Sequence, residues 1–163
     1  MAQRRTTGSN HGASSTNELL AFLRQDELDY PAAALKFGED ALPFLKELVA
    51  SSDENLAIKA AYLVGFIQGD EADKILENAA TVGSAPIRVA AAYGAQKRNS
   101  AGAQAILNHS LEDKDPSVVK FGLLSAKASK LESNLKSKID KISKNFLDEN
   151  IKSVAGEMMK KMK

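Results

Sequence analysis

Hydrophobic residues recur along most of this chain at intervals of three and four, the spacing that gathers side chains on one face of an α-helix. The pattern begins near Asn17 and continues to the end, with polar turns between the periodic segments. Up to residue 129 it predicts helices at about 17–28, 32–38, 39–50, 56–68, 71–81, 87–96, 102–111 and 118–128. The chain is therefore expected to be all-α.

Residues 56–68 are hydrophobic on nearly every side, so this helix must be covered on both flanks. Further on, Leu131, Leu135, Ile139, Ile142 and Phe146 form a single stripe on a predicted helix otherwise rich in Lys and Ser. An amphipathic pattern then runs from residue 151 to the end. These C-terminal helices are expected to cap the fold.

Four of the predicted helices share one pattern when they are aligned on their last small residue. They are Pro31–Gly38, Ile58–Gly65, Ile87–Gly94 and Val119–Ala126, and their offsets are 27, 29 and 32 residues. A repeat of this length usually marks one supersecondary unit that buries its apolar face against the next unit. The recurring small residues predict that neighbouring helices approach closely at these positions.

The repeated unit is a polar turn, an aliphatic residue followed by Lys or Arg, alanines and a glycine, then a second helix. The segments 69–72 (Gly-Asp-Glu-Ala) and 115–120 (Asp-Pro-Ser-Val-Val-Lys) carry it most clearly. Over residues 30–129 the chain resembles the HEAT-repeat (armadillo-like α-solenoid) family. The resemblance implies a short right-handed α-solenoid of stacked antiparallel helical hairpins with helical caps. A compact helical bundle is the alternative, because three or four hairpins barely define a superhelix.

Composition divides the chain into three parts. Residues 1–16 form a Ser-, Thr- and Gly-rich segment that is predicted to be a disordered polar tail. Residues 17–129 hold the HEAT-like repeats, and residues 130–163 are the basic capping helices. Residues 18–129 carry 11 basic and 16 acidic side chains, whereas residues 130–163 carry nine Lys and five acids. An acidic body is therefore followed by a basic C-terminal part.

Catalytic and metal-binding patterns are weak. The chain has no cysteine and only two histidines, His11 and His109, too few for a zinc site. The carboxylates of Asp70-Glu71-Asp73 and Glu112-Asp113-Asp115 are interpreted as helix-terminus residues and not as a metal site. The prediction is a non-enzymatic protein without cofactor or metal. With no apolar run of about 20 residues, no membrane span is expected, and the absence of cysteine favours a cytoplasmic location.

Lys59, Arg88 and Lys120 occupy the same position in successive repeats. The resemblance implies that each pairs with the acidic turn of a neighbouring repeat, and the other possibility is a basic ladder on the inner face. Tyr62 and Tyr93 are interpreted as core residues with hydrogen-bonded hydroxyls more readily than as stacking platforms.

The predicted function is a protein-interaction or scaffold module with a protein partner. The alternative is nucleic-acid binding through the lysine-rich C-terminal helices, where Lys136, Lys138, Lys141 and Lys144 flank the apolar stripe. Lysine is also the usual solvating residue of a capping helix, and no Arg follows Arg98 to supply a phosphate-binding fork. HEAT-like lyases of bilin chromophores suggest a third, enzymatic possibility, which no residue supports beyond the repeat itself.

Overall fold

The computed structural model describes the backbone of residues 8–162 and the side chains of residues 15–162. Within these residues the chain is all-helical, with no strand. The α-helices are α1 (Gly8–Leu23), α2 (Tyr30–Phe37), α3 (Leu42–Val49), α4 (Glu54–Gly65), α5 (Asp70–Val82), α6 (Ala85–Gly94), α7 (Ser100–Ser110), α8 (Pro116–Ala128), α9 (Lys136–Asn145) and α10 (Glu149–Lys161). The prediction of an all-α protein is confirmed. No helix among the described residues is both long and apolar enough to cross a membrane.

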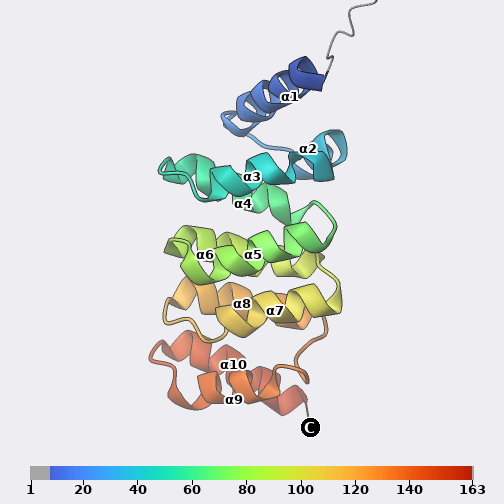
Figure 1. Ribbon diagram of the computed structural model, residues 1–163. Helices are drawn as coiled ribbons and strands as arrows, with labels where there is room; N and C mark the ends of the chain where they lie inside the picture. Colours follow the sequence, from blue (N-terminus) through green and yellow to red (C-terminus); the bar gives the residue numbers. More distant parts are fainter. Residues whose placement is uncertain (1–7, 163) are drawn as a thin grey trace, which may run out of the picture.

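Helices alternate between two layers along the length of the molecule (Figure 1). In one layer α2 packs on α4, α4 on α6 and α6 on α8, and α10 follows against α8. In the other, α5 contacts α3 on one side and α7 on the other. The four helices that the repeat alignment superimposes, α2, α4, α6 and α8, are therefore consecutive neighbours in one layer, which we call the inner layer.

Side-chain caps set the start of many helices. Asp29, Asp53, Asn99, Asp115 and Asp148 each accept a hydrogen bond from a backbone N–H in the first turn of the helix that follows, at 2.8–3.2 Å. Such caps satisfy donors that have no partner within the helix. The polar turns in the sequence are therefore the signals that divide the chain into short helices.

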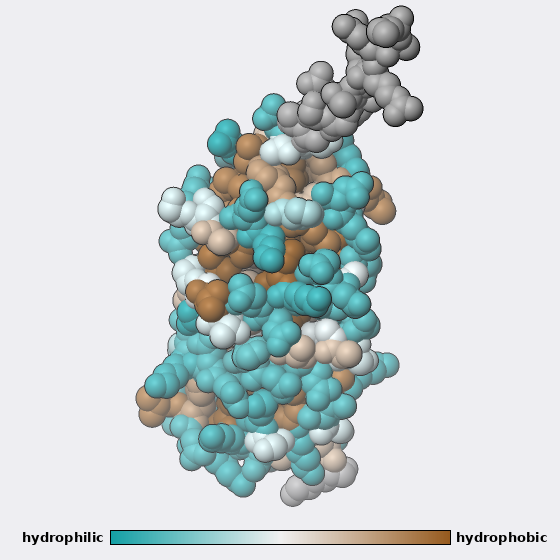
Figure 2. All heavy atoms as spheres, in the orientation of Figure 1, coloured by the Kyte–Doolittle hydropathy of each residue, from teal (hydrophilic) through white to brown (hydrophobic). Residues whose placement is uncertain are grey.

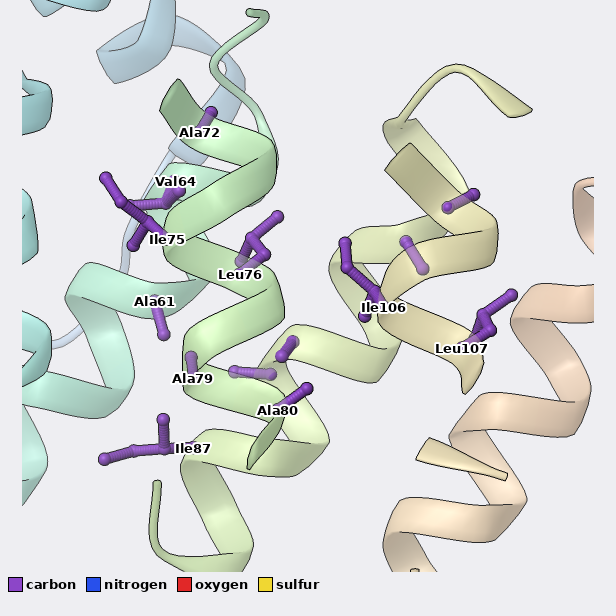
Figure 3. Close-up of a cluster of buried hydrophobic side chains, with 14 of the residues drawn as sticks. Ala61, Val64, Ala72, Ile75, Leu76, Ala79, Ala80, Ile87, Ile106 and Leu107 are labelled. Atoms are coloured by element: carbon purple, nitrogen blue, oxygen red, sulfur yellow. The ribbon is translucent and has the colours of Figure 1, made fainter. Parts of the chain in front are cut away.

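The core is aliphatic and extends without interruption through both layers. Leu63 and Val64 of α4 and Leu76 of α5 are fully buried, and Figure 3 shows how side chains of α4, α5, α6 and α7 meet in one part of this core. Most of α4 is buried, as its apolar sequence predicts, but one side that holds Lys59 and Tyr62 stays partly exposed.

Small residues let the inner-layer helices approach closely. A Cβ atom added to Gly65 would lie 3.2 Å from the Cα atom of Gly94, so the backbones of α4 and α6 are nearly in contact. Between α6 and α8 the Ser125 hydroxyl donates a 2.6 Å hydrogen bond to the Ala92 carbonyl. The close approach that the repeat alignment predicts at Gly65 and Gly94 is confirmed.

Several helix boundaries differ from the sequence prediction; the helix expected over 17–28, for example, ends at Leu23. The helix expected from residue 39 is preceded by a 3-10 turn, Glu39–Ala41, and α3 begins at Leu42 because Pro43 is tolerated only in a first turn. Helix α1 begins at Gly8, inside the segment 1–16 that composition predicts to be disordered, and residues 1–7 lie outside the described residues. The stripe over 131–146 is also not one helix, since Leu131 and Leu135 are buried in the turns before α9.

Candidate binding surface

Seven of the chain's nine aromatic residues form one connected set of ring contacts. They come from α1, α2, α4 with its C-cap, α6 and α8, and all are half-buried. We call this set the aromatic row: Phe22, Tyr30, Phe37, Tyr62, Phe66, Tyr93 and Phe121. Because six of the seven belong to inner-layer helices or their caps, the row follows the inner layer and joins repeats that are far apart in sequence.

Consecutive rings are separated by about one ring width. The centroid of Tyr30 lies 6.0 Å from that of Tyr62, and Tyr62 lies 6.0 Å from Tyr93. Phe121 continues the row at 6.3 Å from Tyr93, and Phe66 stacks on Tyr30 at 5.9 Å with an interplanar angle of 7°. Each ring thus supports the next, so each keeps an accessible part in a fixed place.

The tyrosine hydroxyls differ from the sequence interpretation. Tyr62 and Tyr93 are half-exposed, and neither hydroxyl has a hydrogen-bond partner among residues 15–162. Burial, together with the neighbouring Tyr62, raises the pKa of Tyr30 to about 12. Burial, together with Tyr93, likewise raises the pKa of Tyr62. Tyr62 packs against the core, as interpreted, but the expectation of hydrogen-bonded hydroxyls is wrong for both tyrosines.

Lys97 lies directly on the aromatic row. It belongs to the 3-10 turn Ala95–Lys97 that follows α6, and its Nζ atom lies 4.6 Å from the ring centroid of Phe66 and 5.6 Å from that of Tyr93. These distances are within the range of a cation–π interaction. The backbone carbonyl of Lys97 accepts a hydrogen bond from the Gln68 amide at 3.4 Å, which fixes the turn to the end of α4.

The next residue, Arg98, has the opposite environment. Its guanidinium is buried and donates to the Asp73 carboxylate at 2.6 Å, and to the carbonyls of Gly65, Ile67 and Gly69 at 3.2, 2.6 and 3.2 Å. We call this group the arginine clamp. It satisfies the carbonyls of Gly65 and Ile67 at the end of α4 and joins them to α5, whose Asp73 N–H also donates to the Gly69 carbonyl. No sequence pattern marks this role of Arg98, whose only signal is a position just after a repeat.

The predicted ladder of Lys59, Arg88 and Lys120 does not act as one unit. Arg88 binds Asp113, in the turn after α7, through Nε at 2.7 Å and Nη2 at 3.2 Å, and this bond raises the pKa of Arg88. That is the pairing with an acidic turn that the family resemblance implies. Lys59 instead donates to the Gln25 carbonyl at 3.2 Å, and Lys120 is exposed. Neither lysine has a carboxylate partner among the described side chains.

All four C-terminal candidate lysines belong to α9. Lys138 pairs with Glu112, and the hydrogen bond from Lys138 lowers the pKa of that carboxyl. Lys144 pairs with Asp140 at 2.9 Å, one turn earlier on the same helix. Lys136 and Lys141 are exposed, and Lys141 also lowers the pKa of Glu112. Acidic neighbours therefore balance part of the positive charge of α9.

The acidic clusters have structural partners. Asp73 belongs to the arginine clamp, Asp113 holds Arg88, and Asp115 caps α8. His109 lies in the last turn of α7, 3.5 Å from a Glu77 oxygen. In the described part of the chain, no three His, Cys, Asp or Glu residues are grouped so that they could hold a metal ion.

Two grooves lie outside the aromatic row. One, of about 820 Å³, runs between α3 and α5 and is lined by Val49, Ile75 and Val82 together with Lys46 and Glu71. Figure 2 shows hydrophobic side chains gathered in the upper half of the visible face, which holds α3 and α5, and mainly hydrophilic ones nearer the C-terminus. The other, of about 530 Å³, lies between α8 and α10. The exposed Leu124, three residues after Phe121 on α8, lines it.

Comparison of the chain with protein-family models, with curated proteins and with solved structures gave no match. The candidate surface is therefore defined by geometry: an ordered row of half-exposed rings, with Lys36 and Lys97 over it and Lys59 and Lys120 on helices that carry it. Tyr62 and Tyr93 were recognisable in the sequence, but their different positions within the repeat hid the contact between them.

Proposed function

We propose that the chain is a non-enzymatic protein-interaction module, built as a short HEAT-like α-solenoid, that holds a segment of a partner protein along the aromatic row. Support for the solenoid comes from the inner layer, in which α2, α4, α6 and α8 follow one another in the order of the sequence repeat. A compact bundle would instead group the helices around one central axis.

The observation that carries the binding proposal is the aromatic row itself. Aromatic side chains are usually buried when their role is only to fill a core, and they are enriched at protein interfaces because a rigid ring offers a large apolar area. Here seven such residues stay half-exposed and in contact with one another over five helices. The free tyrosine hydroxyls add hydrogen-bonding groups along the same line.

The spacing of the rings favours an extended partner segment. In an extended strand, alternate side chains point to the same side and repeat every ~6.6–6.8 Å. The steps from Tyr30 to Tyr62, Tyr93 and Phe121 measure 6.0, 6.0 and 6.3 Å, which is close to that repeat. An extended segment could therefore place every second side chain against a successive ring or the space between two rings.

Selection from a library of displayed random peptides tests this proposal, because such a library samples many side-chain sequences without the natural partner being identified first. Peptides recovered on the unmodified protein are then measured against two matched variants. Tyr93→Ser removes a ring from the centre of the row, and Val82→Ser removes an exposed apolar side chain from the α3–α5 groove. We expect the first to weaken binding about tenfold or more and the second to leave it unchanged.

Circular dichroism must show that both variants are folded. Peptides that lose affinity only with Val82→Ser would move the binding site to the α3–α5 groove. Failure to recover any peptide, combined with a mobility shift of DNA or RNA at about 50 mM salt, would favour nucleic-acid binding through α9 instead. The exposed Lys136 and Lys141 would then be the first residues to replace.

A further inference from the structure

The cations beside the aromatic row differ from the cations inside the fold. Arg88 and Arg98 each hold a carboxylate, Asp113 and Asp73 respectively. At the α1–α2 end of the row Lys36 lies over the Phe37 ring and pairs with Glu18 at 3.2 Å. Over α4, α6 and α8 the lysines on or next to the row hold no carboxylate: Lys59, Lys97 and Lys120 have none among the described side chains. From this contrast we infer that the partner segment is acidic and that its carboxylates bind these three lysines. The inference rests on the proposed function and specifies its partner.

The three lysines are distributed along the row. Lys59 precedes Tyr62 by three residues on α4 and so lies on the same side of that helix. Lys97 sits over the rings of Phe66 and Tyr93, and Lys120 precedes Phe121 on α8. A ligand that covers Tyr62 and Tyr93 therefore meets Lys59 and Lys97, and it reaches the exposed Lys120 by continuing around α8 beside Phe121.

The position of Lys97 is the strongest single reason to expect an acidic partner segment. Its position over two rings keeps the ammonium at the surface of the row, where an extended segment would cover it. Covering a charged group without a counter-charge is costly, so a partner without acids would lose affinity at this point. A carboxylate above Lys97 would remove that cost and form a charge-assisted hydrogen bond.

Negative charge marks one end of this basic stretch. Asp26, Glu27 and Asp29 lie in the connection between α1 and α2, and none of them has a cationic partner among the described side chains. The Lys59 ammonium reaches this connection at the Gln25 carbonyl. The acidic part of the partner is thus placed over α4, α6 and α8, and its end near α1 should carry no acid.

Fluorescence anisotropy with three labelled peptides tests the inference. In the acidic probe Phe and Leu alternate with Glu, and in the other two Ser or Lys replaces each Glu. We expect the acidic probe to bind about tenfold or more tighter than the Ser probe, because each exposed ion pair contributes about two- to fivefold. Raising the salt concentration toward 1 M should remove most of this preference, since the Debye length falls to about 3 Å.

Charge-removing variants locate the effect. Replacing Lys59, Lys97 and Lys120 by Met keeps apolar bulk and should abolish the preference for the acidic probe, with little change for the Ser probe. Lys46→Met is the matched control, because Lys46 is an exposed lysine of α3 without a carboxylate partner among the described side chains, and it should change nothing.

Several results would overturn the inference: equal binding of the Ser probe, tighter binding of the Lys probe, no binding of the acidic probe at about 1 mM, or displacement of that probe by much lower amounts of single-stranded RNA. The proposed function is judged separately by Tyr93→Ser. Suppose that the Ser or Lys probe binds best and that Tyr93→Ser weakens its binding. The row is then a peptide site with a different charge preference. If Tyr93→Ser weakens none of the probes, the row is not the site.

Discussion

Lys97 and Arg98 are neighbours in sequence, yet they belong to two regions with opposite character. Arg98 is buried, and four acceptors, one carboxylate and three carbonyls, hold its guanidinium in the arginine clamp. Lys97 lies over two half-exposed rings and has no carboxylate partner among the described side chains. A cation with all its donors satisfied stabilises the fold, whereas one left on an apolar surface can still bind something else.

The same difference separates the two kinds of contact between repeats. Backbones of α4 and α6 meet at Gly65 and Gly94 with no space for a ligand. A short distance along the same helices, Tyr62 and Tyr93 continue that contact at the surface with rings that remain accessible. Packing and recognition are thus adjacent on one pair of helices, and substitutions should separate them.

The largest effect is expected from the arginine clamp. Arg98→Met leaves the largely buried Asp73 carboxylate and the carbonyls of Gly65 and Ile67 without their donor, so the free energy of unfolding should fall by about 3–5 kcal/mol. Urea denaturation followed by circular dichroism measures it. Lys97→Met is the control and should cost no more than about 1 kcal/mol, the value of an exposed cation–π contact. Equal losses for the two variants would contradict the distinction between the regions.

The close helix contact should give the next largest effect. Gly65→Ala places a methyl group 3.2 Å from the Gly94 backbone, and overpacking of this kind costs about 1–3 kcal/mol. That cost should exceed the gain of about 1 kcal/mol from the better helix propensity of Ala. Gly156→Ala in α10 is the control, because its added Cβ meets nothing within 4 Å and should stabilise the protein. Both are compared by urea denaturation.

Arg88 tests whether a more exposed pair behaves like the clamp. Its side chain is 25% exposed, against 1% for Arg98, and it holds one carbonyl, that of Gly83, where Arg98 holds three. Asp113 also keeps the hydrogen bond that it accepts from the Asp115 N–H at 2.9 Å. Arg88→Met should therefore lower the free energy of unfolding by about 1–2 kcal/mol, less than Arg98→Met. If the loss matched that of Arg98→Met, burial would not explain the difference between the two arginines.

The smallest effect concerns pH. Tyr30 has a pKa of about 12 in the folded protein, above its usual value of 10. Between these values the unfolded chain has lost the proton that the folded chain keeps, so unfolding releases a proton and stability falls as pH rises. Absorbance of tyrosinate should show a group titrating near 12. Tyr30→Phe should remove that group and reduce the slope of stability against pH in this window.

Much of the fold could be predicted from the sequence because its signals are local. Asp53, Asn99 and Asp115 read as turn and cap residues before periodic segments, and they start α4, α7 and α8. Where prediction was wrong, a proline, a backbone conformation or burial that periodicity does not report decided the result. Leu131 and Leu135 have helical spacing but lie in turns, since both are buried there and Lys130 takes a left-handed conformation with φ of 57°.

The candidate surface could be predicted only in part. Alignment identified Lys59, Arg88 and Lys120 as equivalent, and the structure gives each a different neighbour. Tyr62 and Tyr93 occupy different repeat positions, so no periodic signal reports that their rings touch. Lys97 and Arg98 fall in the turn after α6, where sequence patterns say little about side-chain direction.

Local sequence signals predict the helical class, the starts of most helices and the repeat, because capping, periodicity and small-residue positions act within about one turn or one helix. Which charges are satisfied and which rings remain accessible depends on the tertiary structure. Asp73 and Arg98 are 25 residues apart, and the aromatic row joins Phe22 to Phe121 through five helices. Contacts between residues so far apart in sequence depend on how the layers pack, and local sequence patterns carry no information about that packing.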